Sequence, residues 1–225
     1  MCGRFFRDAS WATLREWYNL FADGAPNLEP RYNIAPTQDI LIIGKARVKG
    51  GGVRREARWA HWGLVPSWAK DTRLAGNMIN ARAETVSEKP AYRAAFKRRR
   101  CLVPGDGFFE WVKSENGKQP YNIHYKDHHP MTFAGLWEEN EELGIRSVTI
   151  ITTAANDFMK PLHDRMPVLL KPEQYDLWLD HSAPYADAKE LLKPYSGHSL
   201  AAHPVRRAMN SPAYDAPENI EPIEI

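Results

Sequence analysis

At 225 residues, of which 43% are hydrophobic, the chain is long enough to bury one sizeable core, and a single domain is the simplest organisation. Its net charge is only +2, no stretch approaches the ~20 apolar residues of a membrane span, and Arg4, Arg7 and Asp8 interrupt the place where a signal peptide would be apolar. The two cysteines, Cys2 and Cys101, form neither a CxxC pair nor a disulfide framework, which indicates a reducing cytoplasmic or nuclear setting and argues against structural zinc.

The chain begins MCGRF, with one of its two cysteines directly behind the initiator methionine. A small second residue is the usual context for removal of Met1, which leaves the α-amine and the thiol of Cys2 on one Cα. An α-amine titrates near ~7.7–8.0 and a thiol near ~8.5, so this pair is nucleophilic without strong perturbation. The alternative is an accident of sequence in a frayed terminus.

The first predicted element is an amphipathic helix over residues 10–21, with Ser10 as its N-cap and an aromatic stripe that we expect to be buried. A turn is expected at 49–52. Short strands are predicted at 39–44, 57–66, 100–105, 106–112, 119–125, 131–137 and 146–154, and further helices at 156–163, 172–180 and 186–195. This spacing predicts a strand-rich α+β domain built on a β-barrel or sandwich.

Two of these segments carry polar side chains that suit chemistry. In DGFFEWV, strand alternation turns Glu110 to the same side as Phe108, and a carboxylate packed among aromatic rings has a raised pKa and can donate a proton. Its alternative is an outward-facing edge residue. In NMINARAET, Asn80 and Arg82 alternate with apolar residues and could line one side of an extended segment, or belong to a polar loop.

Other candidates have equally ordinary alternatives. His163, in PLHDRMP, could be a general acid or base or a structural histidine. Trp68 follows a proline turn, where it could stack on a base or fill the core. The basic run at 97–100 could face solvent or a polyanion, and the cluster of His124, His128 and His129 is interpreted as surface in preference to a metal site.

The chain ends in an acidic tail, residues 208–225. No Lys or Arg follows Arg207, so residues 1–207 carry 30 basic and 24 acidic side chains, a net charge of +6. That excess is compatible with a polyanionic partner without requiring one. We expect one domain over residues 1–207 and, after it, either an irregular strap or a disordered end.

Six motifs occur in one order: MCGRF, RYNIAPT, WGLVPSW, INARAET, CLVPGDGFFEW and LHDRMPVLL. Together they resemble the SRAP family, the SOS-response-associated peptidase proteins, from Cys2 to about Pro204. The resemblance implies a barrel-like antiparallel sheet core with flanking helices, and a monomer that acts in the cytoplasm on damaged DNA. Where some members have two tryptophans after the proline turn, this chain has Ser67 and Trp68.

The resemblance also implies a partner and a set of roles. The partner is single-stranded DNA, or a junction of single and double strands, that contains an abasic site. The family crosslinks to that site through the N-terminal cysteine, which corresponds to Cys2, without metal or cofactor; lyase cleavage of the strand is left open. The implied polar partners of Cys2 are Asn80, Glu110 and His163. The implied DNA contacts are Arg4, Arg82 and Arg165 at the backbone, and Pro36 and Trp68 at the bases.

Two other functions remain open at this point. One is an N-terminal-nucleophile hydrolase or thiol peptidase, in which Cys2 attacks an amide and His163 is the base. Its only peptidase act could be removal of the residue before Cys2. The other is a noncatalytic reader of modified or single-stranded DNA.

Overall fold

The computed structural model describes residues 2–21, 26–47, 51–115, 117–197 and 199–224. Its strands are β1 Phe5–Arg7, β2 Arg31–Ile34, β3 Asp39–Arg47, β4 Val53–Trp62, β5 Asn80–Arg82, β6 Arg100–Gly105, β7 Gly107–Ser114, β8 Gly117–Tyr125, β9 Met131–Asn140, β10 Ile145–Ala154, β11 Arg165–Pro167 and β12 Leu200–Pro204. Its helices are α1 Trp11–Tyr18, α2 Pro90–Arg98, α3 Tyr175–Leu179 and α4 Tyr185–Glu190, with short 3₁₀ turns at Ala75–Asn77, Pro172–Gln174, Arg207–Asn210 and Pro217–Asn219. None of the helices in this part of the chain is long and apolar enough to cross a membrane.

Five strands close into a ring. The order β10-β4-β3-β6-β9 returns to β10 because β9 and β10 also pair, over Ile145↔Asn140 to Ile150↔Gly135. All of these pairings are antiparallel except β10–β4, and the short β5 adds a second parallel pairing to β10. Closing a sheet removes its free edges, which otherwise invite pairing with other chains. The ring confirms the expected barrel-like, antiparallel core.

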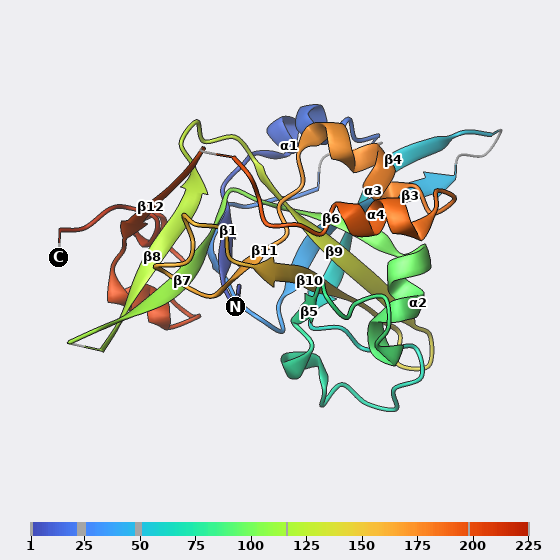
Figure 1. Cartoon of the computed structure of the whole chain (residues 1–225), viewed down its shortest axis with the longest axis horizontal. Coiled ribbons are helices and arrows are strands. Elements are labelled where there is room, and N and C mark those ends of the chain that lie inside the picture. Colours follow the sequence, from blue (N-terminus) through green and yellow to red (C-terminus); the bar gives the residue numbers. More distant parts are fainter. Residues whose placement is uncertain (1, 22–25, 48–50, 116, 198, 225) are drawn as a thin grey trace.

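A second, five-stranded sheet lies beside the ring in the order β12-β8-β7-β1-β2 (Figure 1). Its third and fourth strands, β7 and β1, pair antiparallel with Phe5 opposite Phe108. The rings of Phe5 and Phe108 each meet Phe133 of β9 edge-on, at 5.6 and 6.3 Å between centroids. Such contacts bury large apolar surfaces and fix the angle between the layers. The Phe5 side chain of the N-terminal strand β1 is thereby packed between the two sheets.

The helices cover the other side of the ring. Tyr92, Ala95 and Phe96 of α2 and Trp178 of α3 share one buried cluster with the barrel strands, and Figure 1 shows α2, α3 and α4 together at one end of the molecule. Sequence analysis missed α2, although Pro90 stands at its first turn, where a missing N–H costs nothing. It also missed β1, β2, β11 and β12.

Most predicted elements are confirmed, and the exceptions have physical reasons. The helix over 10–21 exists as α1, where the Ser10 side chain accepts from Thr13 N at 3.1 Å, but Phe21 lies beyond its left-handed end at Asn19 and is exposed. The segment 156–163 forms turns and not a helix, because Pro161 has no N–H to continue the ladder. Part of the predicted turn at 49–52 lies outside the described residues.

The basic run at 97–100 is not a uniform solvated face. Arg100 is buried and donates to three backbone carbonyls, those of Trp178, Phe96 and Asp180, at 2.5–2.7 Å. Arg99 forms an ion pair with Glu138. These two arginines therefore stabilise the junction of α2, α3 and β6, because buried cations need such partners.

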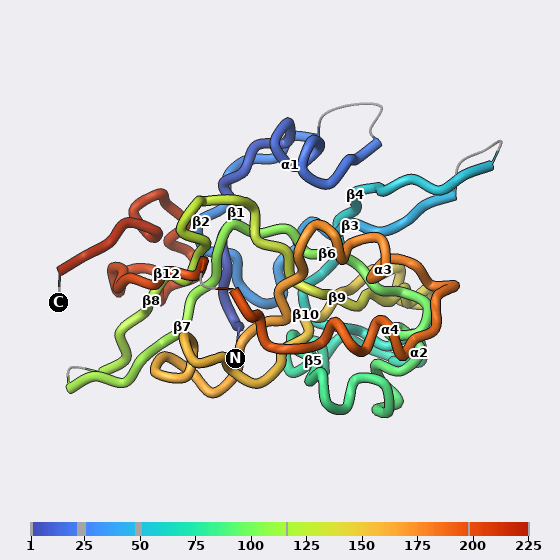
Figure 2. Tube along the Cα trace, turned by 45° about the horizontal axis from the view of Figure 1, so that its top comes forward, coloured from blue at the N-terminus to red at the C-terminus, as the bar shows by residue number. Residues whose placement is uncertain are grey.

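The acidic tail is an ordered strap and not a disordered end. Ile223 N donates to Pro204 O at 3.0 Å, and Met209 is buried against Phe6, Phe109 and Val205. Figure 2 shows the red end of the chain running outside β12 and β8 to the far edge of the molecule.

Candidate functional site

Cys2 lies at the entrance to β1, where the two sheets meet. Its thiol is buried in the apolar cluster that also contains Phe5, Trp62 and Phe133. Burial first, and then the negative charge of Glu110, raise the pKa of this thiol well above its usual value. At neutral pH the thiol therefore keeps its proton until a neighbouring group removes it.

Asn80 holds the backbone of Cys2. It is the first residue of β5, where it pairs with Ile150 of β10, and its Nδ2 donates to Cys2 O at 2.9 Å. Among the described residues, its Oδ1 atom is buried and accepts no hydrogen bond. A buried acceptor of this kind costs about 1–3 kcal/mol until it is satisfied. The Asn80 amide, which contacts Cys2 through its Nδ2, thus also offers an acceptor in its Oδ1 atom.

Glu110 lies on β7, buried with 3% of its surface exposed. Phe109 N donates to Arg4 O at 3.0 Å, and the register that pairs Phe5 with Phe108 places Glu110 beside residue 3, next to Cys2. The charge effect of Glu110 on the Cys2 thiol agrees with this placement. The interpretation of Glu110 as an outward-facing edge residue is therefore wrong.

His163 ends the turns that precede β11. Its Nδ1 accepts from Arg165 N at 2.9 Å, and its own backbone N–H donates to Met159 O at 2.8 Å. An Nδ1 that accepts a hydrogen bond cannot carry a proton, so the neutral ring has its proton on Nε2. The side chain is half-buried. The ring is thus prepared to donate from Nε2.

The three candidate arginines are in different states. Arg165 forms a two-pronged ion pair with Glu84, at 2.5 and 3.0 Å, and also donates to Thr152 O at 2.7 Å. Arg165 in turn lowers the pKa of Glu84 through these hydrogen bonds. Arg82, on β5, pairs with Thr152 of β10, and its side chain is exposed. Arg4 donates to Asn33 Oδ1 and to two backbone carbonyls of the strap.

The two side chains expected at the bases are both accessible. Trp68 is 61% exposed, which excludes the interpretation that it fills the core. It lines a shallow hollow with Lys70 and Arg73. Pro36 is half-buried beside Thr37, whose φ of 69° is unusual for a β-branched residue and marks a locally strained loop.

The described residues hold no group of three or more His, Cys, Asp or Glu side chains that could bind a metal. The His124 ring instead stacks on His128 at 5.1 Å between centroids and meets His203 edge-on at 5.2 Å. Burial is the main cause that lowers the pKa of His124. These rings lie on β8 and β12 and on the turn after β8, where none of the candidate reactive residues is found.

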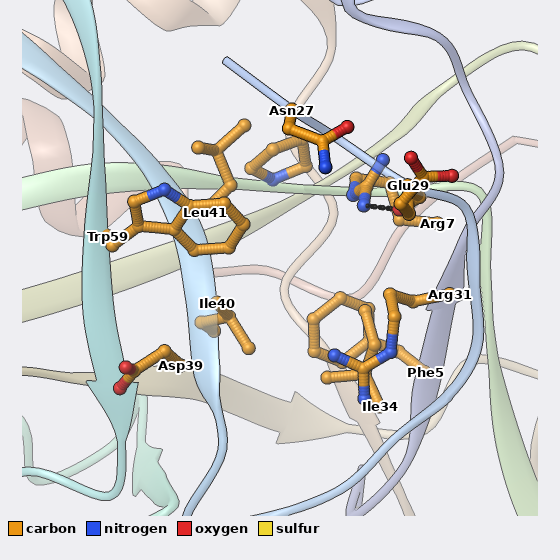
Figure 3. Close-up of a pocket in the computed structure, with 11 residues that line it drawn as sticks. Phe5, Arg7, Asn27, Glu29, Arg31, Ile34, Asp39, Ile40, Leu41 and Trp59 are labelled. Carbon is orange, nitrogen blue, oxygen red and sulfur yellow. Dashed lines mark hydrogen bonds between the residues drawn. The ribbon is translucent and has the colours of Figure 1, made fainter. Parts of the chain in front are cut away.

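A separate cavity of about 190 Å³ is lined mainly by residues of β1, β2, β3 and β4. Figure 3 shows Trp59 and Leu41 on one wall and the side chain of Asn27 facing them. Arg7, in the same lining, donates to Glu29 O at 2.6 Å and to Ala9 O at 3.2 Å, so its charge is used within the fold. None of the candidate reactive side chains lines this cavity.

Comparisons with known proteins show which family and which relatives this chain resembles. The model of the family described as SOS response associated peptidase (SRAP) matches residues 1–212. The abasic site processing protein YoqW of Bacillus subtilis is 38% identical over 98% of this chain and 99% of its own. The abasic site processing protein HMCES of Gallus gallus is 34% identical over 87% of this chain and 67% of its own. The crystal structure of a protein from Bacteroides thetaiotaomicron superposes with a TM-score of 0.84, at 26% identity, over 99% of this chain and all of that one.

Of the three expected partners of Cys2, Asn80 contacts its carbonyl and Glu110 acts on its thiol. His163 instead contacts Arg165 and Met159.

The residues that hold the arginines in place were not expected from the sequence. Asn33 is buried and binds both Arg4 and the strap. The available signal was its place inside RYNIAPT, one of the six motifs. Asp215 gave only a general acidic signal, because its partner is 184 residues away.

Proposed function

This chain belongs to the SOS response associated peptidase (SRAP) family, and we propose that it binds single-stranded DNA at abasic sites and crosslinks to them through Cys2 after Met1 is removed. The proposal extends to junctions of single and double strands and to action as a monomer. The main support is the environment of Cys2: a second-position cysteine whose carbonyl is held by Asn80 and whose thiol feels the charge of Glu110.

The chemistry follows from two nucleophiles on one Cα. The open form of an abasic sugar presents an aldehyde at C1′. The α-amine of Cys2 adds to it and gives a carbinolamine, and loss of water gives an imine. The thiol then adds across the C=N bond, so that sulfur bonds to carbon and the thiol proton ends on nitrogen. The net change is one aldehyde and one aminothiol converted to a thiazolidine and water, without oxidant or reductant.

Ring closure explains why a protonated, buried thiol is sufficient. The attack is intramolecular, and well-oriented intramolecular reactions reach effective molarities of ~10⁵–10⁸ M. Glu110 donates a proton to the leaving carbinolamine hydroxyl and takes one back from the amine nitrogen; during ring closure it accepts the thiol proton and passes it to the ring nitrogen. A serine at this position has a weaker nucleophile, and an internal cysteine such as Cys101 has no free amine.

Asn80 and His163 complete the proposed site. The unsatisfied Oδ1 of Asn80 suits an N–H donor, which the α-amine of a processed Cys2 provides. The Nε2–H of His163 suits donation to the sugar oxygen as the ring opens. Arg4, Arg82 and Arg165 bind phosphates, which makes affinity salt-dependent and independent of sequence.

The bases are held by side chains of a different kind. Pro36 and the exposed Trp68 offer surfaces on which unpaired bases stack, a contact worth ~1–3 kcal/mol per base. Such stacking tolerates any sequence and favours single strands, because paired bases have no free face.

The test uses protein that begins at Cys2 and a single-stranded oligonucleotide with one uracil-derived abasic site. We expect an adduct that survives heat and denaturant without borohydride, with the summed mass of protein and DNA less one water. An N-terminal-nucleophile hydrolase predicts an acyl intermediate with a peptide substrate and no DNA adduct. A noncatalytic reader predicts binding that denaturant reverses. Either result would reject the proposal.

A further inference from the structure

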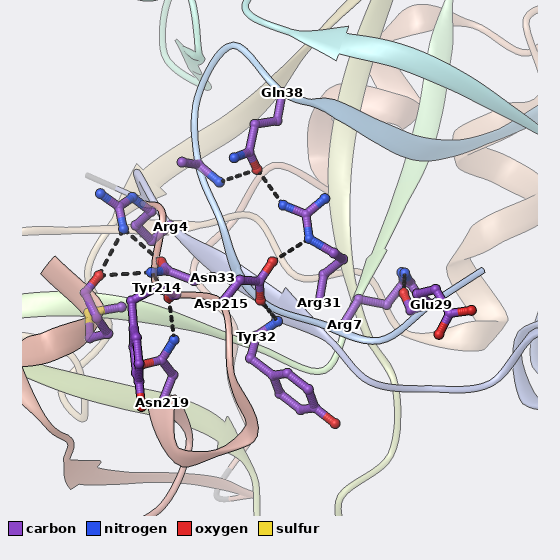
Figure 4. A network of polar contacts seen from close by, with 12 residues as sticks. Arg4, Arg7, Glu29, Arg31, Tyr32, Asn33, Gln38, Tyr214, Asp215 and Asn219 are labelled. Carbon is purple, nitrogen blue, oxygen red and sulfur yellow. Dashed lines mark hydrogen bonds and ion pairs between the residues drawn. The ribbon is translucent and has the colours of Figure 1, made fainter. Parts of the chain in front are cut away.

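The C-terminal strap, residues 208–224, is bonded to the same elements that carry the proposed DNA contacts. Asn33 Nδ2 lies 2.8–2.9 Å from three strap carbonyls, those of Met209, Ser211 and Tyr214. Figure 4 shows Asn33, Tyr214 and Asp215 of this network together with Arg4, Arg31 and Gln38. Asp215 accepts from Arg31 Nε and, at 2.5 Å, from the backbone N–H of Tyr32.

The strap orients Arg4 without neutralising it. Arg4 Nη1 donates to Asn33 Oδ1 at 2.6 Å and to Met209 O at 3.0 Å, and Nη2 donates to Asn210 O at 3.2 Å. All three acceptors are uncharged. Arg165 and Arg31, by contrast, are paired with Glu84 and Asp215. Arg4 is therefore held in one position while its positive charge stays available to a phosphate.

The strap also reaches the loop that carries Pro36. Arg31, whose Nε donates to Asp215, donates through Nη2 to Gln38 Oε1 at 2.8 Å. The same Gln38 oxygen accepts from Ala35 N at 3.1 Å. This chain of hydrogen bonds closes the loop at 35–38, in which Thr37 has its strained backbone. A strained loop persists only when its surroundings hold it.

We propose that the strap is a functional part of the DNA site: Asp215 and Asn33 are positioning residues that fix the Pro36 loop and Arg4 before DNA arrives. This inference rests on the proposed function. It concerns a segment whose residues beyond 212 lie outside the family match. Asp215, one of the acidic residues of the strap, is then directed at Arg31 and not at Arg4.

The expected benefit is preorganisation. Ordering a flexible side chain on binding costs ~0.5–1.5 kcal/mol, which is about 2- to 12-fold in affinity for each side chain that is already in place. Loss of the strap contacts therefore weakens DNA binding by this factor. The opposite model, in which an acidic strap repels DNA or competes for its cations, predicts that loss of a strap carboxylate tightens binding.

The deciding experiment compares Asp215→Ala with Glu221→Ala. Both variants remove one carboxylate from the strap, but Glu221 pairs with the exposed Arg206 at 3.4 Å and, among the described residues, makes no hydrogen bond or ion pair to Arg4 or to the loop at 35–38. Binding is measured by fluorescence anisotropy with a labelled single-stranded oligonucleotide that has no abasic site. We expect Asp215→Ala to bind about 2- to 12-fold more weakly, with an unchanged salt slope, and Glu221→Ala to bind as wild type or slightly more tightly.

Two results overturn the inference: equal affinities for the two variants, or tighter binding by both. If the wild-type protein does not bind this oligonucleotide at all, the proposed function itself fails. The melting temperature of each variant is measured alongside, so that a loss of affinity is scored only for folded protein.

A second set of variants keeps the inference testable if Asp215→Ala does not fold. Asn33→Ala should reduce the log–log salt slope by about 0.7, as Arg4→Ala should, because both remove one phosphate contact to a single strand. The double variant should add almost nothing to either, since Asn33 acts through Arg4. Additive losses of slope would reject Asn33 as a positioning residue for Arg4.

Discussion

The two cysteines are equally buried but have different polar neighbours. Cys2 and Cys101 are both fully buried, in the same apolar cluster, and burial raises the pKa of both thiols. Around Cys101 the contacts are structural: Trp178 Nε1 donates to its carbonyl at 2.8 Å, and the ladder sets it opposite Gly135. Around Cys2 there are an amide with an unsatisfied oxygen and a buried carboxylate, Glu110.

The difference shows that burial and thiol pKa do not identify a reactive cysteine in this fold. Because a thiol must lose its proton to be nucleophilic, the raised pKa alone predicts that both side chains are unreactive. What distinguishes Cys2 is its place at the start of the chain and the polar side chains delivered by β5 and β7. The predictions below test each part of that distinction, from the largest expected effect to the smallest.

Exchange of the cysteines breaks the comparison most directly. We expect Cys2→Ala to lose the heat-stable adduct with abasic single-stranded DNA completely, while Cys101→Ala keeps wild-type yield and loses about 1 kcal/mol of stability. A Schiff base through the residual α-amine of Cys2→Ala should still be trapped by borohydride. Denaturing gels measure the yield and urea unfolding measures the stability. Equal loss in both variants contradicts the assignment, as does crosslinking by protein with an uncleaved tag before Cys2.

Removal of the carboxylate sharpens the comparison at one atom. Glu110→Gln keeps the shape of the side chain but cannot accept or return a proton. We therefore expect crosslinking to slow by ~10²–10⁴ while affinity for ordinary single-stranded DNA is unchanged. Quenched time courses measure the rate, and anisotropy measures the affinity. Adduct formation at the wild-type rate would make Glu110 a structural residue.

Asp106 follows β6, the strand of Cys101, and its carboxylate binds the segment just after β1, the strand that Cys2 precedes, so its titration tests how these two segments are held together. It lies between β6 and β7, and its Oδ2 accepts from Asp8 N and Ala9 N at 2.8 and 2.9 Å. Burial, opposed in part by these hydrogen bonds, raises its pKa from 3.8 to about 7. A carboxyl group whose pKa is raised on folding binds a proton more tightly in the folded state, so its contribution is present at low pH and is lost as pH rises through about 7.

We therefore expect Asp106→Asn to flatten the pH dependence of the free energy of unfolding. The fall in this free energy from pH 5 to pH 8 should be smaller in the variant than in wild type by roughly 2–4 kcal/mol. Urea unfolding at the two pH values measures this. Glu141→Gln, at an exposed position that is absent from the causes of the Asp106 shift, serves as the control and should change it much less. A wild-type stability that does not fall between pH 5 and pH 8 contradicts the prediction.

The smallest effect concerns two arginines, Arg100, which precedes Cys101, and Arg82, on the same strand as Asn80. Arg100, next to Cys101, donates hydrogen bonds to three backbone carbonyls. Arg82, on the same strand as Asn80, is exposed. We expect Arg82→Ala to lower the log–log salt slope by about 0.7 for every single-stranded sequence. Lys193→Ala, which removes an exposed cation paired with Glu190, is the matched control and should leave the slope unchanged. A loss confined to certain sequences would mean that Arg82 contacts bases.

Local patterns were reliable where a segment's own residues decide its structure. The Ser10 cap and the apolar spacing predicted α1, and short apolar runs bounded by turn residues predicted the long strands β3, β9 and β10. The short strands β1, β2 and β12 could not be predicted, because strands of three to five residues exist only through their partners in the sheet. The segment at 156–163 failed for the opposite reason: its helical spacing was real, but Pro161 ends the hydrogen bonding.

For the candidate site, the sequence by itself determined the chemistry that is available: a cysteine at position 2, and the motifs that carry Asn80, Glu110 and His163. Those are properties of residue type and order. Only the tertiary structure decided which groups meet. It placed Asn80 on the carbonyl of Cys2 through β5, and buried Glu110 against the start of β1. It also buried Arg100 with hydrogen bonds to backbone carbonyls and brought the strap into hydrogen-bond contact with Arg31 and Arg4. Such contacts join residues up to 206 positions apart, and no local pattern encodes a partner at that distance.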